Sequence, residues 1–269
     1  MDRPHWAPES IDVERPSVAR MYDYYLGGSH NFAADRAAAQ AMITAVPDAP
    51  LMAQANRAFM RRVVQFLVES GIRQFLDIGS GIPTVGNVHE IAQRLAPESK
   101  VAYVDVDPVA VAHSREILAG NDRTTILQED LRNPERILHD PQVRKLLDFD
   151  QPVAVLIVAV LHFVPDSDDP AGILAELRAA LAPGSHLVLS QASDDGRSDE
   201  ERREADQIYR RTDNPLNIRS RAALTSFFDG FDLLPPGVVW VPQWRPESPE
   251  AAEDAERAVF MGGVGRLGG

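Results

Sequence analysis

Residues 74–106, QFLDIGSGIPTVGNVHEIAQRLAPESKVAYVDV, place a strand, a helix and a second strand one after another. The apolar runs 75–78 and 101–106 predict the two strands. Between them, apolar residues recur at helical spacing until Pro97 closes the helix. These helical positions are Val88, Ile91, Ala92 and Leu95. The segment is therefore typical of one β-α-β unit of a parallel sheet.

The same alternation continues along the chain. Residues 124–127, 153–160 and 186–190 predict three more strands, with helical patterns between them. Parallel neighbours need crossover connections, and crossover helices cover both faces of the sheet. The order therefore predicts an α/β fold built on a mostly parallel sheet.

The C-terminal part departs from this alternation. Residues 231–234, 238–241 and 258–261 are short strand candidates, and an acidic helix is expected at about 248–256. Short strands in direct succession are typical of antiparallel pairing. We expect the sheet to end in an antiparallel hairpin.

Three parts are expected along the chain. Residues 1–16 are charged and proline-rich and indicate a flexible arm, whereas residues 17–70 have helical spacing up to Gly71 and predict a helical cap or lid. Residues 71–269 form the sheet-containing core. No second compact domain is expected.

The amino-acid composition disfavours or excludes several classes of function. Lys and Arg number 27 against 40 Asp and Glu, so the net charge of −13 disfavours binding to nucleic acid. The absence of cysteine excludes disulfides, thiolate metal sites and cysteine nucleophiles. The longest apolar run, residues 153–161, is too short to span a membrane, and the first residues have no secretory apolar region. We expect a cytoplasmic protein that binds neither membrane nor nucleic acid; its oligomeric state is not indicated.

Three successive strands end in residues suited to a ligand. Asp77 and the turn Gly79-Ser80-Gly81 end the first, Asp105 the second and Asp130 the third. In such sheets ligands bind at the carboxyl ends of the strands. Asp105 suits two ribose hydroxyls and Asp130 an exocyclic amine. Taken singly, the glycines could form a plain tight turn and Asp130 could be a surface acid; Asp107 is assigned as the cap of the following helix.

The glycine pattern discriminates among nucleotides. A dinucleotide site needs GxGxxG, but Thr84 stands at the third position and Pro83 precedes it. No phosphate-binding GxxxxGK[ST] motif occurs. An adenosyl ligand without phosphate fits better, and S-adenosylmethionine (SAM) answers that description.

Read together, Leu76–Gly81, Val104-Asp105 and Glu129-Asp130 resemble the class I SAM-dependent methyltransferases. Residues 16–36, 77–92 and 227–246 more closely resemble an actinobacterial methyltransferase-like family of largely unassigned substrate. The resemblance covers nearly the whole chain. It implies a Rossmann-like methyltransferase fold with a seven-stranded sheet, and SAM as cofactor.

The resemblance also implies roles for individual residues. Asp77, Gly79, Ser80 and Gly81 would border the methionine part of SAM. Asp105 would hold the ribose, Val106 would lie beside adenine, and Asp130 and Leu131 would meet its polar edge. Ala159 and Val160 would line the sulfonium side. The motif Asp/Asn-Pro-Pro-aromatic of many amino-group methyltransferases is missing, which weakens nucleobase or glutamine N-methylation.

Two further segments are candidate substrate contacts. Tyr22 and Tyr25 lie three residues apart, so they share a helix face and could point into a cleft. Gly27-Gly28 would be a flexible break that lets residues 17–35 act as a lid, although a permanently packed cap is the alternative. His162 is a candidate general base or acceptor contact, with a structural hydrogen bond as its alternative. No histidine pair has metal-ligand spacing, so no metal is expected.

The resulting hypothesis is methyl transfer from SAM to a small-molecule acceptor. The sulfonium is already activated, so alignment and exclusion of water do most of the work and no fixed catalytic residue is predicted. A SAM-binding regulatory or interaction module without turnover is the first alternative. A nucleotide-dependent oxidoreductase is the second, and Thr84 counts against it.

Overall fold

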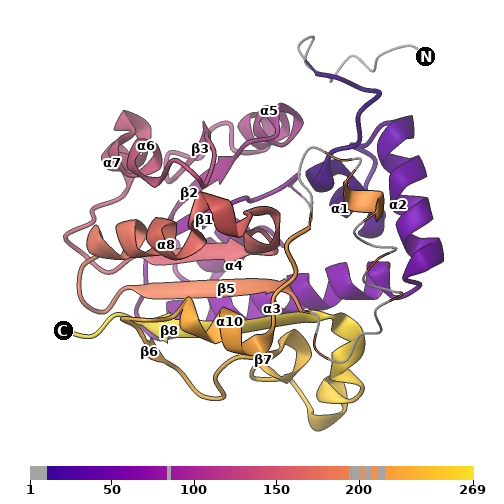
Figure 1. The fold of residues 1–269 in the computed structure, drawn as a ribbon. Helices are drawn as coiled ribbons and strands as arrows, with labels where there is room; N and C mark the ends of the chain where they lie inside the picture. The colour runs from indigo at the N-terminus through magenta and orange to yellow at the C-terminus, as the bar shows by residue number, and fades with distance from the viewer. Residues whose placement is uncertain are drawn as a thin grey trace.

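The fold is an open twisted sheet with helices on both faces and a helical cap at one end (Figure 1). The computed structural model describes residues 11–83, 86–193, 195, 200, 203, 207–210, 212 and 216–269. Three helices precede the sheet: α1 (Val18–Tyr25), α2 (Ala33–Ala45) and α3 (Ala49–Glu69). Of the described helices, none has both the length and the apolar character needed to cross a bilayer.

The sheet begins with five parallel strands. They are β1 (Gln74–Ile78), β2 (Lys100–Asp105), β3 (Thr124–Gln128), β4 (Ala154–Val158) and β5 (His186–Ala192). Their spatial order is β3-β2-β1-β4-β5, so the direction of winding reverses between β1 and β4. That reversal places a crevice at the carboxyl ends of β1 and β4.

Three strands close the sheet in antiparallel pairing. They are β6 (Asp232–Leu233), β7 (Val239–Trp240) and β8 (Phe260–Arg266). β8 pairs with β5 along seven residues, and both β6 and β7 pair with β8. The sheet has eight strands, one more than the seven expected: seven follow the path β3-β2-β1-β4-β5-β8-β6, and β7 pairs with β8 beside it.

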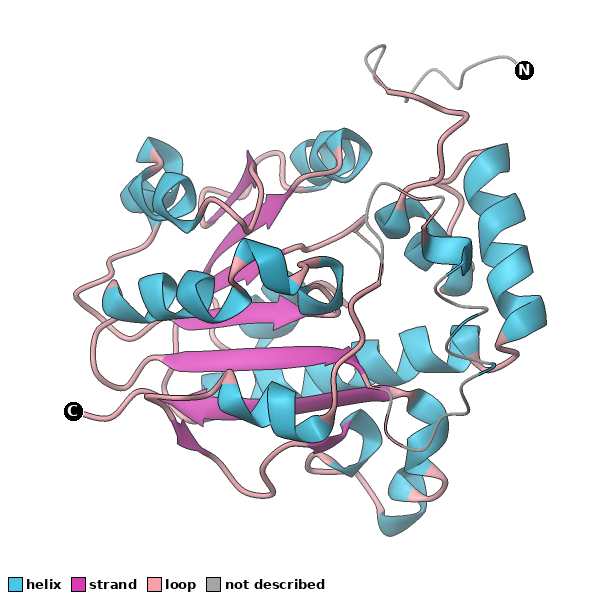
Figure 2. Cartoon of the chain, viewed as in Figure 1, coloured by secondary structure: helices cyan, strands magenta, loops and turns pink. Residues whose placement is uncertain are grey.

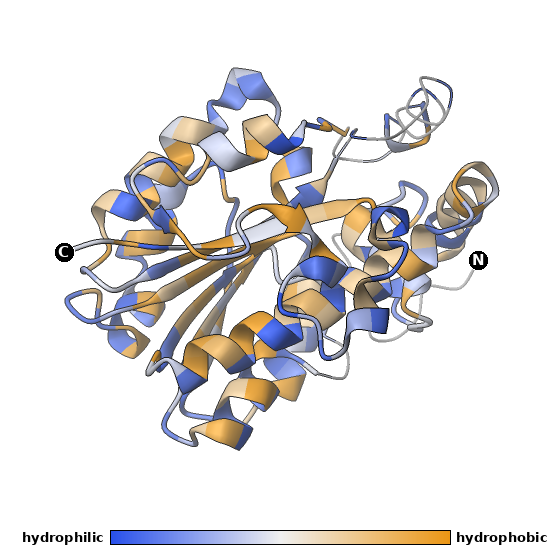
Figure 3. Ribbon diagram, turned by 90° about the horizontal axis from the view of Figure 1, so that it is seen from below, coloured by the Kyte–Doolittle hydropathy of each residue, from blue (hydrophilic) through white to orange (hydrophobic). Residues whose placement is uncertain are grey.

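The connecting helices form two layers around the strands (Figure 2). They are α4 (Val88–Leu95), α5 (Pro108–Ile117), α6 (Pro134–His139), α7 (Pro141–Leu146), α8 (Pro170–Ala179) and α10 (Arg221–Ser226). Side chains of β1 alternate between the layers, since Phe75 packs with α3 and α4 while Leu76 packs with α6 and α8. The strands are accordingly mainly hydrophobic between the helices (Figure 3).

Helix starts follow the proline rule. α5, α6 and α7 each begin at a proline preceded by Asp or Asn, as the sequence predicts. At α5, the Asp107 carboxylate accepts hydrogen bonds from the backbone N–H groups of Val109 (2.7 Å) and Ala110 (3.3 Å). The predicted capping role of Asp107 is therefore confirmed.

Two sequence expectations for the tail need correction. The acidic helix expected at 248–256 is replaced by two short 3₁₀ helices, Pro249–Ala252 and Ala255–Ala258. The last strand runs to Arg266 instead of ending at Met261. Its glycines obscured the strand pattern in the sequence. A Cβ on Gly265 would lie 2.8 Å from the Phe228 ring and from Cβ of Phe231, so close packing replaces the usual β-branched pattern.

Candidate functional site

A cavity of about 560 Å³ opens between the cap and the carboxyl ends of β1 to β4. All the site residues expected from the sequence line it, although they come from five separate segments. They are Tyr22, Tyr25, Asp77, Gly79, Ser80, Gly81, Asp105, Val106, Asp130, Leu131, Ala159, Val160 and His162. The fold thus brings the predicted cofactor residues and the predicted substrate residues into one site.

The glycine turn after β1 packs directly against the end of β4. The N–H groups of Gly79 and Ser80 donate to the Val104 carbonyl at 2.7 and 3.1 Å, which fixes the turn to β2. Gly79 has a positive φ of 75°, and a Cβ on it would lie 2.3 Å from Cγ2 of Val160. Gly81 has a similar φ of 69° but open space beside it. Gly79 is therefore required by close approach as well as by backbone angle.

Asp105 is held by backbone amides and keeps capacity for a ligand. Its carboxylate accepts hydrogen bonds from the N–H groups of Gly81 (2.6 Å) and Asp107 (2.8 Å). A carboxylate offers about four acceptor positions, so about two remain for a diol. Burial raises the pKa of Asp105 to about 6. The remaining acceptor positions of Asp105 therefore fit the two hydroxyl groups of a ribose.

Asp77 is buried at the end of β1 and faces a charge that the sequence did not predict. Burial raises its pKa to about 7, Asp105 adds to the rise, and the Arg57 guanidinium opposes it. Arg57 belongs to α3 and lines the same cavity. An acid and a guanidinium that influence each other therefore line the same cavity. Arg57 lies in no recognisable motif, and only the packing of α3 on the sheet reveals it.

At the end of β3 the expected adenine contacts are only partly free. Arg132 donates to both carboxylate oxygens of Asp130, and its hydrogen bonds lower the pKa of Asp130 despite the opposing effect of burial. Beside them, Val106 lines the cavity with 51% of its surface exposed. An exposed apolar side chain at a cavity wall suits a flat base, whereas Asp130 already has an ionic partner.

A buried chain of hydrogen bonds connects the cap to the end of β4. Ala159 has a positive φ of 61°, and its N–H donates to the Ser190 hydroxyl (3.0 Å). That hydroxyl donates to Oδ1 of Asn56 (2.6 Å), whose amide nitrogen donates to the Tyr22 hydroxyl (3.1 Å). The Tyr22 hydroxyl donates to the Ala53 carbonyl (3.0 Å). β4 ends at Val158, two residues earlier than predicted, where the backbone turns at Ala159. The Tyr22 hydroxyl donates one of these hydrogen bonds and accepts another.

His162 occupies a structural position. It is 3% exposed, and its Nδ1 accepts a hydrogen bond from the Ala192 N–H at 3.4 Å. Burial, with Arg219 nearby, lowers the pKa of His162 to about 3. A ring with so low a pKa is a poor proton acceptor at neutral pH. The structure therefore favours the structural alternative over a general base, while leaving the ring at the cavity wall.

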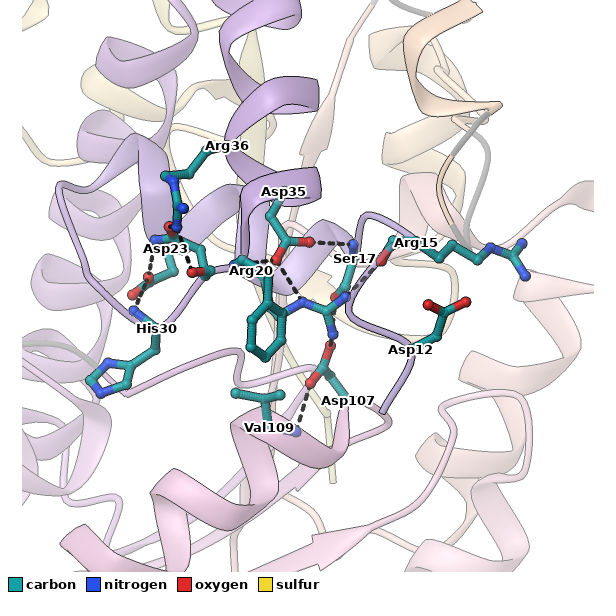
Figure 4. A network of polar contacts seen from close by, with 12 residues as sticks. Asp12, Arg15, Ser17, Arg20, Asp23, His30, Asp35, Arg36, Asp107 and Val109 are labelled. Atoms are coloured by element: carbon teal, nitrogen blue, oxygen red, sulfur yellow. Dashed lines mark hydrogen bonds and ion pairs between the residues drawn. The ribbon is translucent and has the colours of Figure 1, made fainter. Parts of the chain in front are cut away.

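An ionic network fastens the cap to the core beside the cavity (Figure 4). The Arg20 guanidinium bonds to Asp35 of α2 (2.9 Å) and to Asp107 at the start of α5 (3.2 Å). Ser17 donates its hydroxyl to Asp107 and its N–H to Asp35. All four side chains are buried. We call Ser17, Arg20, Asp35 and Asp107 the latch.

Gly27-Gly28, where a flexible break is expected, forms a hydrogen-bonded turn, because the N–H groups of Gly27 and Gly28 donate to the carbonyls of Tyr24 and Asp23. A Cβ on Gly28 would lie 2.0 Å from the carboxylate of Asp23, which is 2% exposed. That carboxylate accepts hydrogen bonds from the His30 N–H (2.9 Å) and the Asn31 side chain (2.8 Å) (Figure 4). Gly28 thus makes room for a buried acid that organises the loop.

Among the described residues, no group of three or more His, Asp or Glu side chains is arranged to hold a metal ion. Thr84, which stands at the third glycine position, lies outside the described residues.

Comparisons with known proteins agree on one family. The family model described as S-adenosyl methyltransferase matches residues 4–268. A crystal structure of a proposed methyltransferase from Thermobifida fusca is 37% identical, covers 99% of this chain and 100% of its own, and superposes with a TM-score of 0.92. A DUF574 family protein from Streptomyces avermitilis is 41% identical, with 95% and 99% coverage and a TM-score of 0.90.

More distant relatives share the fold alone. An O-methyltransferase family protein from Burkholderia thailandensis is 14% identical over 82% of this chain and 58% of its own, with a TM-score of 0.54. Among curated proteins, none matches the chain.

Proposed function

The chain belongs to the S-adenosyl methyltransferase family, and on that premise we propose that SAM binds across the carboxyl ends of β1 to β4. The family, the Rossmann-like fold and SAM as cofactor confirm what the sequence resemblance predicted. The protein is a SAM-dependent methyltransferase. The alternatives of a module without turnover and of an oxidoreductase are not favoured by these relatives.

Each part of the cofactor has a proposed place. The ribose hydroxyls bind Asp105, and adenine covers Val106 and reaches Leu131, with Asp130 at its edge. The methionine end lies over the Gly79–Gly81 turn, and its sulfur faces Ala159 and Val160. Asp77 takes the α-ammonium group. The observation that carries the assignment is the amide-held carboxylate of Asp105 beside the glycine turn, in one cavity.

Arg57 extends this proposal to the other charge of the methionine part. Its guanidinium lies close enough to Asp77 to lower the carboxyl pKa, and both line the cavity. An α-amino acid carries an ammonium and a carboxylate on one carbon, so neighbouring opposite charges match it. We assign the carboxylate to Arg57.

The protein's part in the chemistry is to align the reactants and exclude water. When bound, SAM supplies a methyl group on a sulfonium that needs no further activation. The turn at Ala159, fixed through Ser190 and Asn56, positions the wall beside that methyl group. The cap, residues 17–70, covers the cavity as a proposed lid. We place the enzyme in the cytoplasm and its acceptor among small molecules rather than nucleic acids, supported by the net charge of −13 and the lack of cysteine.

Calorimetric titration with S-adenosylhomocysteine tests the site. Asp105→Ala removes the acceptor for two hydroxyls and is expected to cost about 1.5–3 kcal/mol, a ten- to hundredfold loss of affinity. Asp140→Ala is the matched control, because Asp140 also accepts two backbone N–H bonds, at the start of α7 and away from the cavity. Equal affinity of wild type and Asp105→Ala contradicts the ribose assignment. Transfer of a labelled methyl group to a metabolite extract separates an enzyme from a module without turnover.

A further inference from the structure

The sheet order divides the cavity into two ends of different chemistry. Acids lie at the carboxyl ends of β1, β2 and β3, whereas β4 is followed by Leu161–Phe163, and β8, which pairs with β5, begins at Phe260. We call the part over β4, β5 and β8 the acceptor end. Cofactor bound as proposed above fills the part over β1 to β3, so the acceptor end is what faces its sulfur.

Aromatic rings form one wall of the acceptor end. The His162 ring lies 5.5 Å from that of Phe260 and 4.2 Å from that of Phe163, measured between centroids. Phe163 lies 5.8 Å from Tyr209. All four residues line the cavity. They form a continuous row from the edge of the sheet to the cap, and aromatic rows of this kind favour a flat aromatic ligand.

The cap supplies the opposite wall and one polar group. Met42, Met52 and Ala49 line the cavity from α2 and α3. Tyr25 from α1 joins them; it is 8% exposed, and its hydroxyl faces that of Tyr209 without a hydrogen bond of normal geometry. A buried hydroxyl whose one neighbour is poorly placed does not recover the hydrogen bonds it made to water. A ligand group placed there would restore one.

The charged residues that line the cavity lie elsewhere. Within the described residues they belong to the ends of β1, β2 and β3, to segment 12–20, or to Arg57. Arg20 and Arg132 are bound to carboxylates. A charged substituent at the acceptor end would lose water without gaining an ionic partner.

We propose that the methyl acceptor is an uncharged aromatic molecule, stacked along Phe163 and Tyr209 and hydrogen-bonded to the Tyr25 hydroxyl. This inference rests on the proposed cofactor site, because it takes the acceptor end to be the space in front of the sulfur. It names a substrate class and three residues that select it.

The transfer follows from this placement. A lone pair on the acceptor's oxygen or nitrogen forms the new bond to the methyl carbon. The carbon–sulfur bond breaks, and its electron pair stays on sulfur, which becomes a neutral thioether. The acceptor takes up the positive charge and loses it with a proton released to water. Burial keeps the Tyr25 pKa far above neutrality and the His162 pKa near 3, so neither group takes that proton at neutral pH. The acceptor must be nucleophilic in its neutral form.

The test uses the full chain saturated with S-adenosylhomocysteine and three related probes. Calorimetry compares 2-naphthol with 6-hydroxy-2-naphthoate, which adds a charge, and with decahydro-2-naphthol, which removes the aromatic rings. We expect 2-naphthol to bind about tenfold more tightly than either. Tyr25→Phe and Phe163→Leu are each expected to weaken 2-naphthol about five- to tenfold while changing the affinity for S-adenosylhomocysteine less than twofold.

Tyr24→Phe is the matched control. Tyr24 is next to Tyr25, but its hydroxyl points to Gln40 and it does not line the cavity. The proposed acceptor class would be overturned by any of three results. These are equal binding of all three probes, no binding of 2-naphthol to the loaded protein, or an affinity for 2-naphthol that is unchanged in Tyr25→Phe and Phe163→Leu. Failure of S-adenosylhomocysteine itself to bind would instead count against the proposed cofactor site.

Discussion

The two ends of the cavity are built in different ways. The cofactor end consists of three strand ends between residues 77 and 131, held by hydrogen bonds from backbone amides. The proposed acceptor end is assembled from α1, α2, α3, the turn after β4, Tyr209 and Phe260, and its lining is mainly apolar and aromatic. Backbone-held carboxylates constrain the sequence tightly. A wall of apolar side chains constrains only size and shape, so one fold can keep its cofactor while changing its acceptor.

The largest expected effect comes from breaking the latch, which should loosen the cap over the cavity while leaving the strand ends intact. Arg20→Ala leaves the buried carboxylates of Asp35 and Asp107 without their cation, which is expected to cost about 3–5 kcal/mol. Hydrogen exchange of residues 17–35 should increase strongly while the strands stay protected. Arg257→Ala, which removes an exposed ion pair with Asp48, should leave the exchange unchanged.

The same experiment tests the lid. Residues 17–35 of the wild type are expected to gain protection when S-adenosylhomocysteine is added. Identical exchange with and without ligand means that the cap is a permanent wall.

Substitutions at Gly79 test the contact between the turn after β1 and Val160 after β4. In Gly79→Val the side chain meets Val160 and pushes it into the cavity, so affinity for S-adenosylhomocysteine should fall more than a hundredfold in a chain that still folds. Gly81→Ala has the same backbone strain without the collision and should lose less. Adding Val160→Ala to Gly79→Ala should restore part of the binding. If Val160→Ala restores no binding, the whole loss of affinity comes from the backbone angle at residue 79.

Arg57→Gln sharpens the description of the cofactor end. Affinity for S-adenosylhomocysteine should fall about tenfold, because a charge-assisted hydrogen bond to its carboxylate is lost. Methylthioadenosine has no amino-acid part, so its affinity should change less than twofold. Arg61→Gln, an exposed position one turn further along α3, is the control. Equal losses for both ligands would show that Arg57 only supports the fold.

The smallest expected effect is a pH dependence from Asp77. Its pKa of about 7 in the folded protein exceeds the ordinary value of 3.8, so its contribution to stability is present at low pH and is lost as pH rises through 7. A bound ammonium group favours the ionised form. Affinity for S-adenosylhomocysteine should therefore rise several-fold between pH 5.5 and 7.5. Asp77→Asn, or methylthioadenosine as ligand, should show a weaker rise; an unchanged slope would remove Asp77 from the ammonium site.

The sequence predicted the cofactor end better than the acceptor end. Strand periodicity and the glycine turn predicted that Asp77, Gly79 and Asp105 lie together, and they line one cavity because successive parallel strands bring their ends to one edge. Nothing in the local sequence pointed to Arg57, Asn56 or Phe163, whose place depends on how distant elements pack.

Two positions illustrate the same limit. Gly27-Gly28 looked flexible because the buried Asp23 that fills its space was invisible. His162 looked reactive because a strand end suggested it, while its burial and its low pKa follow only from tertiary packing. Burial is a property of the whole fold, so local patterns predict motifs better than environments.

The most direct test of the central claim is a crystal structure of the full chain with S-adenosylhomocysteine. The account predicts the ribose hydroxyls on Asp105, adenine over Val106, and the sulfur facing Ala159 and Val160, with space left beside Phe163. A ligand lying in the reverse direction, or bound away from the ends of β1 and β2, would contradict it.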